Sequence, residues 1–455
     1  MSKSKYIPAA AVFISAIILI YVLVMPIGVA DGGGQYKFVE SIGLAYVSPP
    51  SAEYIQTQYI ASGANGRISD TPSAIATLAV NLGGGRTLNI SLLGFLYAIL
   101  LLFGIRFVVK GGARGDIFDI VIAALCVLIF ADTGYTAFLN TLSGEAATFT
   151  TLLISVGLIA LCYKKHSARA GITVMSALAA ISFALCGTLQ ALVGIVLGLV
   201  IWGISYAWDT KGAKYTAIIT GGIVVAVSIA FAVTYKPVDY NKNIYNSVFF
   251  GIAKYESVEA LGLNPRLNEL KEVFYSESLI SEYNLKNEFF DKINYGKIVG
   301  FYITHPVAFF KGIDSSVKNA YALRPSYLGN FAQGRGEPGG QSKWFSLYSS
   351  FKAKFIPNTL TFTVIFFGLY FGFLIFIFAT DQKKRPIAGM LAALGLAAGI
   401  CLKIPFVLSG GFEIGRALFL YNILFDLMVI SAIVGGARFM RERRQILQNK
   451  YGATQ

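Results

Sequence analysis

The stretch that decides the fold is residues 359–379, TLTFTVIFFGLYFGFLIFIFA, which contains no charged side chain. A helix needs about 20 mainly apolar residues to cross a hydrocarbon core about 30 Å thick. Other apolar stretches predict further spans at residues 8–28, 91–109, 117–131, 149–163, 171–187, 188–207, 215–234, 386–402 and 417–436. The sequence therefore predicts an all-α polytopic membrane protein with about ten transmembrane helices.

The composition excludes several other classes of protein. Of the 455 residues, 55% belong to the set AVILMFWYC and 14% are charged, and the mean hydropathy is +0.62. Soluble domains are about 25% charged, so this chain lacks the charge to cover soluble cores of its size. Its formal charge of +14 is spread over short clusters between apolar stretches. A nucleic-acid-binding surface would instead gather these charges on one solvated face.

The basic clusters predict the orientation of the chain. They lie at the N-terminus, in alternate connections between spans and in the C-terminal tail, whereas residues 132–148 contain neither Lys nor Arg. Lys and Arg are enriched on the cytoplasmic side of a membrane. We therefore predict a multi-pass protein of the plasma (inner) membrane with both termini in the cytoplasm. The four cysteines lie in or beside apolar stretches without CxxC spacing, which argues against a disulfide or zinc framework.

These spans divide the chain into three parts. Residues 1–234 form an N-terminal transmembrane module with about seven helices and a first outer loop at 29–90. Residues 235–358 form a large extracytoplasmic loop, and residues 359–455 form a C-terminal module with about three helices and a basic cytoplasmic tail. Within the large loop, apolar residues recur at helical spacing over 309–321. This pattern predicts an amphipathic helix that lies on the membrane surface or caps the bundle; the alternative is an ordinary amphipathic helix of a small folded lobe.

Three acidic residues at the outer face are candidate catalytic groups. Asp31 directly follows the first span and precedes three glycines, which leave room for a ligand. Asp132 and Glu145 lie in a short outer connection without basic residues. The alternative interpretation is that all three are simply hydrated acids. The chain has no GxxxxGK[ST], GxSxG or HExxH motif, so nothing indicates an ATP-driven pump, a serine hydrolase or a zinc protease.

Four basic residues are candidates for binding a phosphate. Lys403 and Arg416 are the basic residues of a short outer loop and run against the orientation bias. The planar guanidinium of Arg suits phosphate oxygens, and His305 and Arg324 in the large loop are candidates to join it. The alternative for Arg416 is a local ion pair with Glu413.

The last span contains a carboxylate, Asp426, four residues after Asn422 and so on the same side of the helix. Burying it costs about 2.5–3.5 kcal/mol, so we expect it to have a partner on a neighbouring helix. With two histidines in the chain, a metal would need oxygen ligands. No metal ligands and no cofactor are assigned, and a divalent metal at the outer site is left open.

Several segments together resemble the GT-C class of polytopic glycosyltransferases, in particular the bacterial hexose transferases of surface-layer and other envelope glycans. The segments are 26–31 (PIGVAD), 132–145 (from DTGY to GE), 245–251 (YNSVFFG), 302–306 (YITHP), 324–330 (RPSYLGN) and 410–416 (GGFEIGR). The resemblance lies in their order and topology and spans most of the chain.

The resemblance implies an enzyme that transfers a hexose from a polyprenyl-phosphate-linked donor to an extracytoplasmic glycan or lipid-linked acceptor. It implies a general base in the first outer loop, at Asp31, with acidic help from Asp132 and Glu145. Two other functions remain alternatives: an envelope polysaccharide polymerase or ligase, and a transporter or flippase of lipid-linked glycans. A transporter would be expected to have broken helices and charges along a midplane path, and Asp426 is the clearest such charge.

Overall fold

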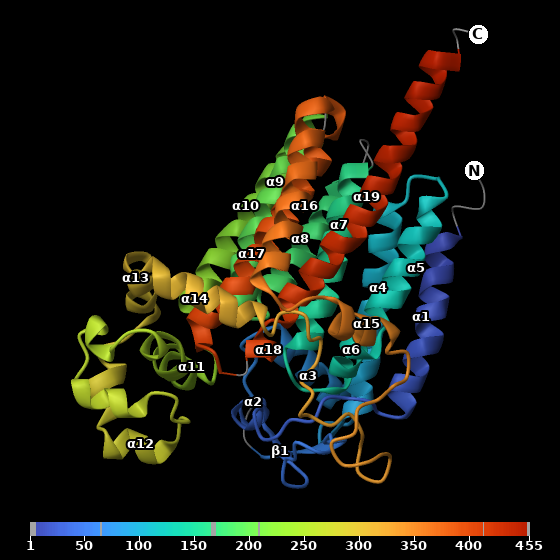
Figure 1. Cartoon of the computed structure of the whole chain (residues 1–455). Helices are drawn as coiled ribbons and strands as arrows, with labels where there is room; N and C mark the ends of the chain where they lie inside the picture. Colours follow the sequence, from blue (N-terminus) through green and yellow to red (C-terminus); the bar gives the residue numbers. More distant parts are fainter. Residues whose placement is uncertain (1–5, 64–65, 165–169, 208–209, 413, 453–455) are drawn as a thin grey trace.

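The structure is a computed structural model that describes residues 6–63, 66–164, 170–207, 210–412 and 414–452. A bundle of long helices carries a layer of loops and short elements at one end (Figure 1). The long helices are α1 (Ile7–Val24), α4 (Ile90–Gly112), α5 (Phe118–Phe130), α7 (Glu145–Lys164), α8 (Ala170–Ala184), α9 (Thr188–Gly203), α10 (Lys211–Thr234), α16 (Leu360–Thr380), α17 (Arg385–Ser409) and α19 (Phe419–Gly452). Each predicted span falls on one of these helices.

Within the described ranges, 8 helices are long and apolar enough to cross a membrane. A ninth span arises if α5 is joined to residues 133–140, from which it is bent by 49°. The remaining predicted span, α8, has only 15 residues and packs against α7, α9 and α10. The prediction of an all-α polytopic membrane protein is confirmed, while the predicted count of ten depends on the bent α5 and the short α8.

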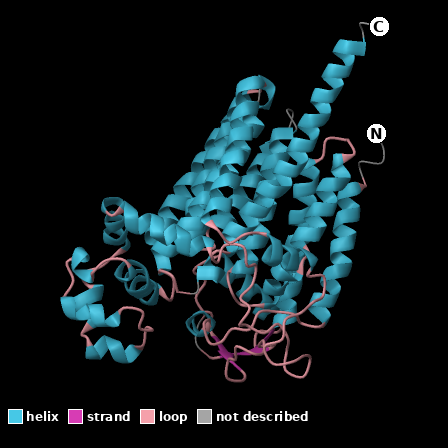
Figure 2. Cartoon of the chain, in the orientation of Figure 1, coloured by secondary structure: helices cyan, strands magenta, loops and turns pink. Residues whose placement is uncertain are grey.

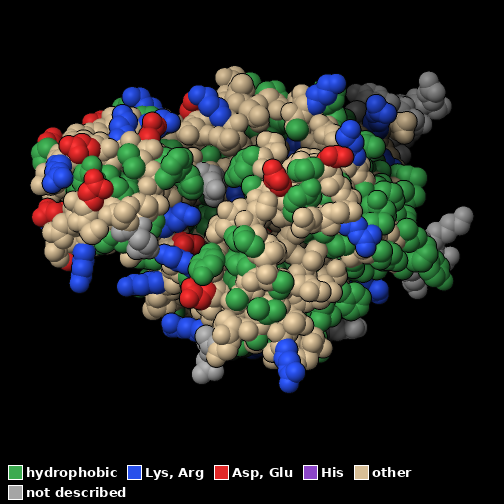
Figure 3. Space-filling model, turned by 90° about the horizontal axis from the view of Figure 1, so that it is seen from below, with side chains coloured by type: hydrophobic (Ala, Val, Ile, Leu, Met, Phe, Trp, Pro, Cys, Tyr) green, Lys and Arg blue, Asp and Glu red, His purple; other side chains and the backbone are tan. Residues whose placement is uncertain are grey.

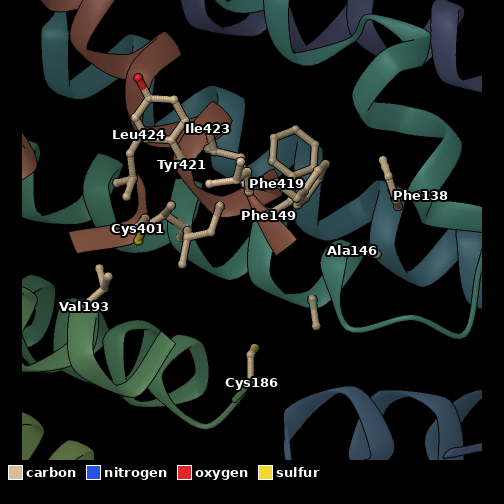
Figure 4. Close-up of a cluster of buried hydrophobic side chains, with 14 of the residues drawn as sticks. Phe138, Ala146, Phe149, Cys186, Val193, Cys401, Phe419, Tyr421, Ile423 and Leu424 are labelled. Carbon is tan, nitrogen blue, oxygen red and sulfur yellow. The ribbon is translucent and has the colours of Figure 1, made fainter. Parts of the chain in front are cut away.

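Small residues let the helices approach closely. A Cβ atom on Gly157 of α7 would lie 2.6 Å from the backbone of Phe107 in α4, and one on Gly221 of α10 would lie 2.7 Å from the Trp202 nitrogen at the end of α9. Such contacts replace the hydrophobic driving force that helices lack in lipid. Buried side chains of α7, α9, α17 and α19 then fill the centre of the bundle, as Figure 4 shows.

The chain begins and ends at the same end of the bundle, opposite the loop layer (Figure 1). Several predicted basic clusters lie at this end and are partly neutralised there. Arg438 pairs with Asp116 at 2.9 Å and with Asp119 at 3.0 Å, and Lys384 pairs with Glu442. An even number of spans places both ends of a chain on the same side of the membrane, and the predicted topology has an even number.

The first outer loop contains strands that the sequence analysis did not predict. Its elements are α2 (Tyr36–Ser41), β1 (Leu44–Tyr46), β2 (Gln58–Ala61), α3 (Thr71–Leu82) and β3 (Thr87–Asn89). The strands form an antiparallel sheet in the order β1-β2-β3, in which Tyr46 faces Tyr59 (Figure 2). Three or four residues are too few to show an alternating pattern, so their pairing depends on the tertiary structure.

The large outer segment contains five short α-helices in two places. α11 (Tyr240–Asn246), α12 (Glu277–Glu282), α13 (Tyr295–Thr304) and α14 (Pro306–Val317) lie on one side of the bundle, and α15 (Leu347–Phe355) lies apart from them against α5 and α6 (Thr133–Thr136) (Figure 1). Acidic and basic side chains gather on the lobe at the left of Figure 3, which contains α12 and α13. The predicted amphipathic helix is α14, which packs on α17 and ends at Val317. A one-turn helix, α18 (Ile414–Ala417), leads into α19.

Candidate functional site

The backbone before Asp31 is fixed by the large outer segment. The Gly28 nitrogen donates to the Asn330 carbonyl at 3.0 Å, and the Ala30 nitrogen donates to the Gly329 carbonyl at 2.9 Å. The buried Asn330 side chain donates back to the Gly28 carbonyl at 2.7 Å. Two of the quoted sequence segments, far apart in the chain, therefore meet and set the position of Asp31.

The Asp31 carboxylate is partly exposed and held by two donors. Its Oδ1 accepts a hydrogen bond of 2.7 Å from the Gln35 nitrogen, and its Oδ2 accepts one from the Tyr46 hydroxyl on β1. Burial, and then the hydrogen bond to Asp31, raise the pKa of Tyr46 well above its usual range. Tyr46 thus stays protonated at physiological pH and keeps donating to the carboxylate.

Arg416 forms an ion pair with Glu145. Its positive charge also slightly opposes the rise in the pKa of Tyr46. The Arg416 Nε donates to Glu145 Oε1 at 2.5 Å, and each of the two side chains is 16% exposed. Glu145 is the first residue of α7, where the helix dipole favours a negative charge. The structure thus pairs two of the predicted site residues, Glu145 and Arg416. Glu413, the alternative partner, lies outside the described residues.

A cavity of about 530 Å³ opens beside Arg416. Arg324, Tyr327, Gln341 and Ser349 also line it, so two of the predicted phosphate-binding residues share one space. Arg324 donates to Asn330 Oδ1 at 2.6 Å and to the Ser342 carbonyl at 2.8 Å. Because Asn330 in turn holds the Gly28 carbonyl, Arg324 supports the loop that carries Asp31.

Asp132 occupies a different environment from Asp31. It is fully buried, and its Oδ1 accepts from the Gly134 nitrogen at 2.7 Å. Its Oδ2 accepts from the nitrogens of Tyr348 at 2.9 Å and Ser349 at 3.0 Å, in the first turn of α15. These nitrogens have no acceptor within their own helix, so the carboxylate caps α15 and fastens it to the end of α5. This geometry favours an anchoring role for Asp132.

Lys403 and His305 lie away from the cavity beside Arg416. Lys403 is 5% exposed, and its Nζ lies 4.4, 4.6 and 5.0 Å from the ring centres of Phe406, Phe309 and Tyr302. The Nδ1 of His305 lies 2.9 Å from the Thr304 hydroxyl, and its ring stacks on Phe301. The predicted phosphate-binding set is thus split between two places, because α14 packs over the outer part of α17 and covers Lys403.

Asp426 has the partner that was predicted for it. Its Oδ1 accepts from Lys352 Nζ at 2.6 Å and from the Tyr348 hydroxyl at 2.5 Å, and its Oδ2 accepts from the Tyr135 hydroxyl at 2.5 Å. The side chains of Lys352 and Asp426 are both 0% exposed. The sequence analysis missed Lys352 and Tyr46. The need of a buried Asp426 for a cation was the one signal that pointed towards Lys352.

The predicted carboxylates do not converge on one point. Among residues 6–63, 66–164, 170–207, 210–412 and 414–452, no group of three or more His, Cys, Asp or Glu side chains lies close enough to hold a metal ion. Instead, Asp31 binds the Tyr46 hydroxyl, Asp132 binds backbone nitrogens, and Glu145 binds Arg416. We therefore derive no chemical step through a metal.

The fold and this site define the class: a polytopic membrane protein whose connecting segments form a cavity at one end of the bundle. The chain belongs to the family described as the YfdI N-terminal transmembrane domain, whose family model matches residues 2–453. Neither a curated protein nor a solved structure matches the chain.

Proposed function

We propose that this protein is a membrane glycosyltransferase of envelope glycan metabolism. It transfers a hexose from a polyprenyl-phosphate-linked donor to an extracytoplasmic glycan or a lipid-linked acceptor. The observation that carries the proposal is the ion pair of Arg416 with Glu145 at the wall of a cavity of about 530 Å³, in a chain whose Asp31 carboxylate is partly exposed and bound by Tyr46. Group transfer from a sugar phosphate requires a base and a stabiliser of phosphate charge, and these residues supply both.

In the proposed reaction, Asp31 is the general base. It takes the proton of an acceptor hydroxyl while the hydroxyl oxygen forms a bond to the anomeric carbon of the donor. The bond between that carbon and the phosphate oxygen breaks, and the polyprenyl phosphate leaves with the electron pair. A positioned general base typically contributes about 10²–10⁴-fold to such a step. Tyr46 orients the carboxylate through its hydrogen bond.

Arg416 is the proposed ligand of the leaving phosphate. The hydrogen bond from its Nε to Glu145 fixes the plane of the guanidinium at the cavity wall. A planar guanidinium can present two parallel N–H groups to phosphate oxygens, which an ammonium cannot. In this assignment Glu145 positions Arg416 and does not act as a base. Tyr327, 58% exposed on the same cavity wall, offers an aromatic face to a sugar.

One observation weighs against the transporter alternative. The bent α5 is a feature that this alternative predicts, but Asp426, the clearest charge for it, is fully buried and bound to Lys352, Tyr135 and Tyr348. A carboxylate with these partners is stabilised in place and is a poor element of a moving path, because leaving them would expose an unpaired charge to an apolar interior.

The test is to incubate the purified full chain with a polyprenyl-phosphate hexose and an envelope-glycan acceptor. The expected products are polyprenyl phosphate and a hexosylated acceptor in equal amounts. Transport of the intact donor across vesicles without release of polyprenyl phosphate would favour the flippase. Transfer of a preassembled glycan, with no use of the monosaccharide donor, would favour the polymerase or ligase.

The same proposal requires the loop layer to lie outside the plasma membrane, with both termini in the cytoplasm. A single cysteine introduced at an exposed position such as Glu256, in a background without the four native cysteines, should react with an impermeant thiol reagent on intact cells or spheroplasts. A cysteine at Lys383, at the opposite end of the bundle, should react only after permeabilisation. The reverse labelling pattern would contradict both the topology and the function.

A further inference from the structure

A second cavity lies where the ends of the long helices meet the group of short helices around α11 and α13. It has a volume of about 520 Å³, within the range of about 300–1,000 Å³ that is typical of small-molecule sites. Its walls combine apolar side chains of the long helices, such as Leu189, Ala232 and Leu408, with polar side chains of the short ones. None of its described lining residues also lines the cavity beside Arg416. The two cavities are therefore separate binding spaces.

Three tyrosines from three different parts of the chain meet at this second cavity. Tyr235 follows α10, Tyr240 begins α11 and Tyr295 begins α13. The Tyr235 hydroxyl donates to Asp70 Oδ2 at 2.7 Å, and the Tyr295 hydroxyl donates to the Leu408 carbonyl at 2.9 Å. The Tyr240 ring lies edge-to-face against Tyr295, with 5.6 Å between the ring centres. These contacts orient the rings before a ligand binds, so binding costs little side-chain entropy.

Two polar side chains on the cavity wall are available to a ligand. Tyr240 and Asn243 are three residues apart in α11 and therefore lie on the same face of the helix. Within the part of the chain that the structure describes, neither the Tyr240 hydroxyl nor the Asn243 amide has a hydrogen-bond partner. Lys236 is the one charged side chain among the described lining residues, and its Nζ lies 5.4 Å from the Tyr240 ring centre. The cavity thus offers a hydroxyl and an amide to an uncharged ligand.

We propose that this cavity binds an uncharged hexose residue of a glycan. A sugar ring has an apolar C–H face, which packs on apolar and aromatic side chains, and a rim of hydroxyls, which pair with amide and phenol groups. The wall of apolar side chains and oriented tyrosine rings matches the first surface, and Tyr240 and Asn243 match the second.

The assignment rests on the proposed function only in identifying this glycan as the acceptor. Leu408, near the end of α17, lines the second cavity, and Gly411 lines the cavity beside Arg416. Because these two residues are three positions apart in the chain, an acceptor several sugars long can occupy both cavities. Binding of a remote sugar in the second cavity would then help to hold the reacting sugar in place.

The test measures sugar binding without turnover, on the purified full chain in detergent. The probes are glucose, galactose, mannose, rhamnose and N-acetylglucosamine, and saturation-transfer-difference NMR gives the Kd of each. At least one probe should bind saturably. The double variant Tyr240→Phe/Asn243→Ala should weaken its binding about tenfold or more, because two hydrogen bonds are lost. The matched control is Tyr206→Phe/Asn241→Ala, which removes the same groups at exposed positions outside the cavity.

A second pair of variants tests the location. Ala232→Trp fills the cavity from the last turn of α10 and should abolish binding, whereas Ala230→Trp, at an exposed position of the same helix, should not. The site would be overturned by the absence of saturable binding, by unchanged affinity in Ala232→Trp or in the double variant, or by tighter binding of glucuronate than of glucose. Saturable binding to a chain that releases no polyprenyl phosphate would support this cavity and overturn only the proposed transferase.

Discussion

Two acid–base pairs in the outer half of the molecule have similar geometry and different surroundings. Lys352 and Asp426 are 2.6 Å apart with both side chains 0% exposed, whereas Arg416 and Glu145 are 2.5 Å apart with both 16% exposed. Two tyrosine hydroxyls complete the shell of Asp426, while a cavity adjoins Arg416. The distance within an ion pair therefore does not indicate whether the pair is structural or functional. A pair enclosed by other side chains can only stabilise the fold, whereas a pair next to a cavity can also bind a ligand.

The largest expected effect is at Asp31, a partly exposed carboxylate in the same loop layer as the accessible pair. Asp31→Asn should lower the turnover of hexose transfer by about 10²-fold or more, because the amide cannot accept the acceptor proton. Its thermal unfolding temperature should stay close to that of the unaltered chain, since Asn still accepts hydrogen bonds from Gln35 or Tyr46. The measurement is polyprenyl phosphate release at saturating donor.

Asp132→Asn is the matched control for Asp31→Asn, and Glu145→Gln is measured beside them although it also disturbs the position of Arg416. Near-normal turnover in Asp31→Asn, together with loss of turnover in Asp132→Asn, or in Glu145→Gln with donor KM unchanged, would move the general base to the second outer connection. The transferase proposal would then stand with a different base.

The second effect concerns the stability of the closed pair. Lys352→Met leaves Asp426 as a buried charge without a cation and should lower the free energy of unfolding by about 3–5 kcal/mol. The double variant Lys352→Met/Asp426→Leu should recover much of this loss, since a buried ion pair can be replaced by apolar side chains at little cost. Denaturation of the detergent-solubilised chain measures both. If Lys352→Met were as stable as the unaltered chain, water would have to reach Asp426. The Lys352–Asp426 pair would then not differ from the Arg416–Glu145 pair in its access to solvent.

The third prediction tests the accessible pair directly. Arg416→Lys retains the charge but loses the planar fork, so the KM for the polyprenyl-phosphate donor should rise about tenfold or more, as expected for the loss of one hydrogen bond to a charged group. The unfolding temperature should change little, because the lysine keeps a positive charge beside Glu145. A lower unfolding temperature with an unchanged KM would assign Arg416 and Glu145 the same structural role as Lys352 and Asp426.

The smallest effect is expected at Asp132. Asp132→Asn removes one of the oxygens that cap α15 and should destabilise the chain by about 1 kcal/mol, the typical contribution of a helix cap. Turnover should fall less than tenfold at a temperature where the variant is folded. A loss of turnover as large as that in Asp31→Asn, without loss of stability, would contradict the anchoring role.

The predicted spans succeeded because hydrocarbon thickness fixes a length and a polarity that a stretch such as 359–379 shows without reference to the rest of the chain. The need of Asp426 for a partner was predictable for the same reason, since an unpaired charge in an apolar medium is costly. The identity of Lys352 was not, because it lies 74 positions earlier, in a loop whose sequence reads as solvated. The strands around Tyr46 were missed because they are too short to carry a pattern.

The sequence predicted that acidic and basic residues form the candidate site, but it only partly predicted which of them do. The break in the positive-inside pattern singled out both Lys403 and Arg416, and nothing local distinguishes them. The structure separates them, because α14 covers Lys403 with aromatic rings while α18 presents Arg416 to a cavity. Asp31 and Asp132 were likewise equivalent in the sequence, until one proved partly exposed and the other capped α15.

The sequence by itself determined that the chain spans a membrane several times and which stretches do so, because burial in lipid is a demand on each segment separately. Only the tertiary structure decided which polar residues form a site. Tyr46, Glu145 and Arg416 come from three separate elements and Asp31 from a loop, and the hydrogen bonds of residues 329 and 330 with the segment before Asp31 bring distant parts of the chain together. Proximity between such residues follows from how the helices and loops pack, and packing depends on all segments at once.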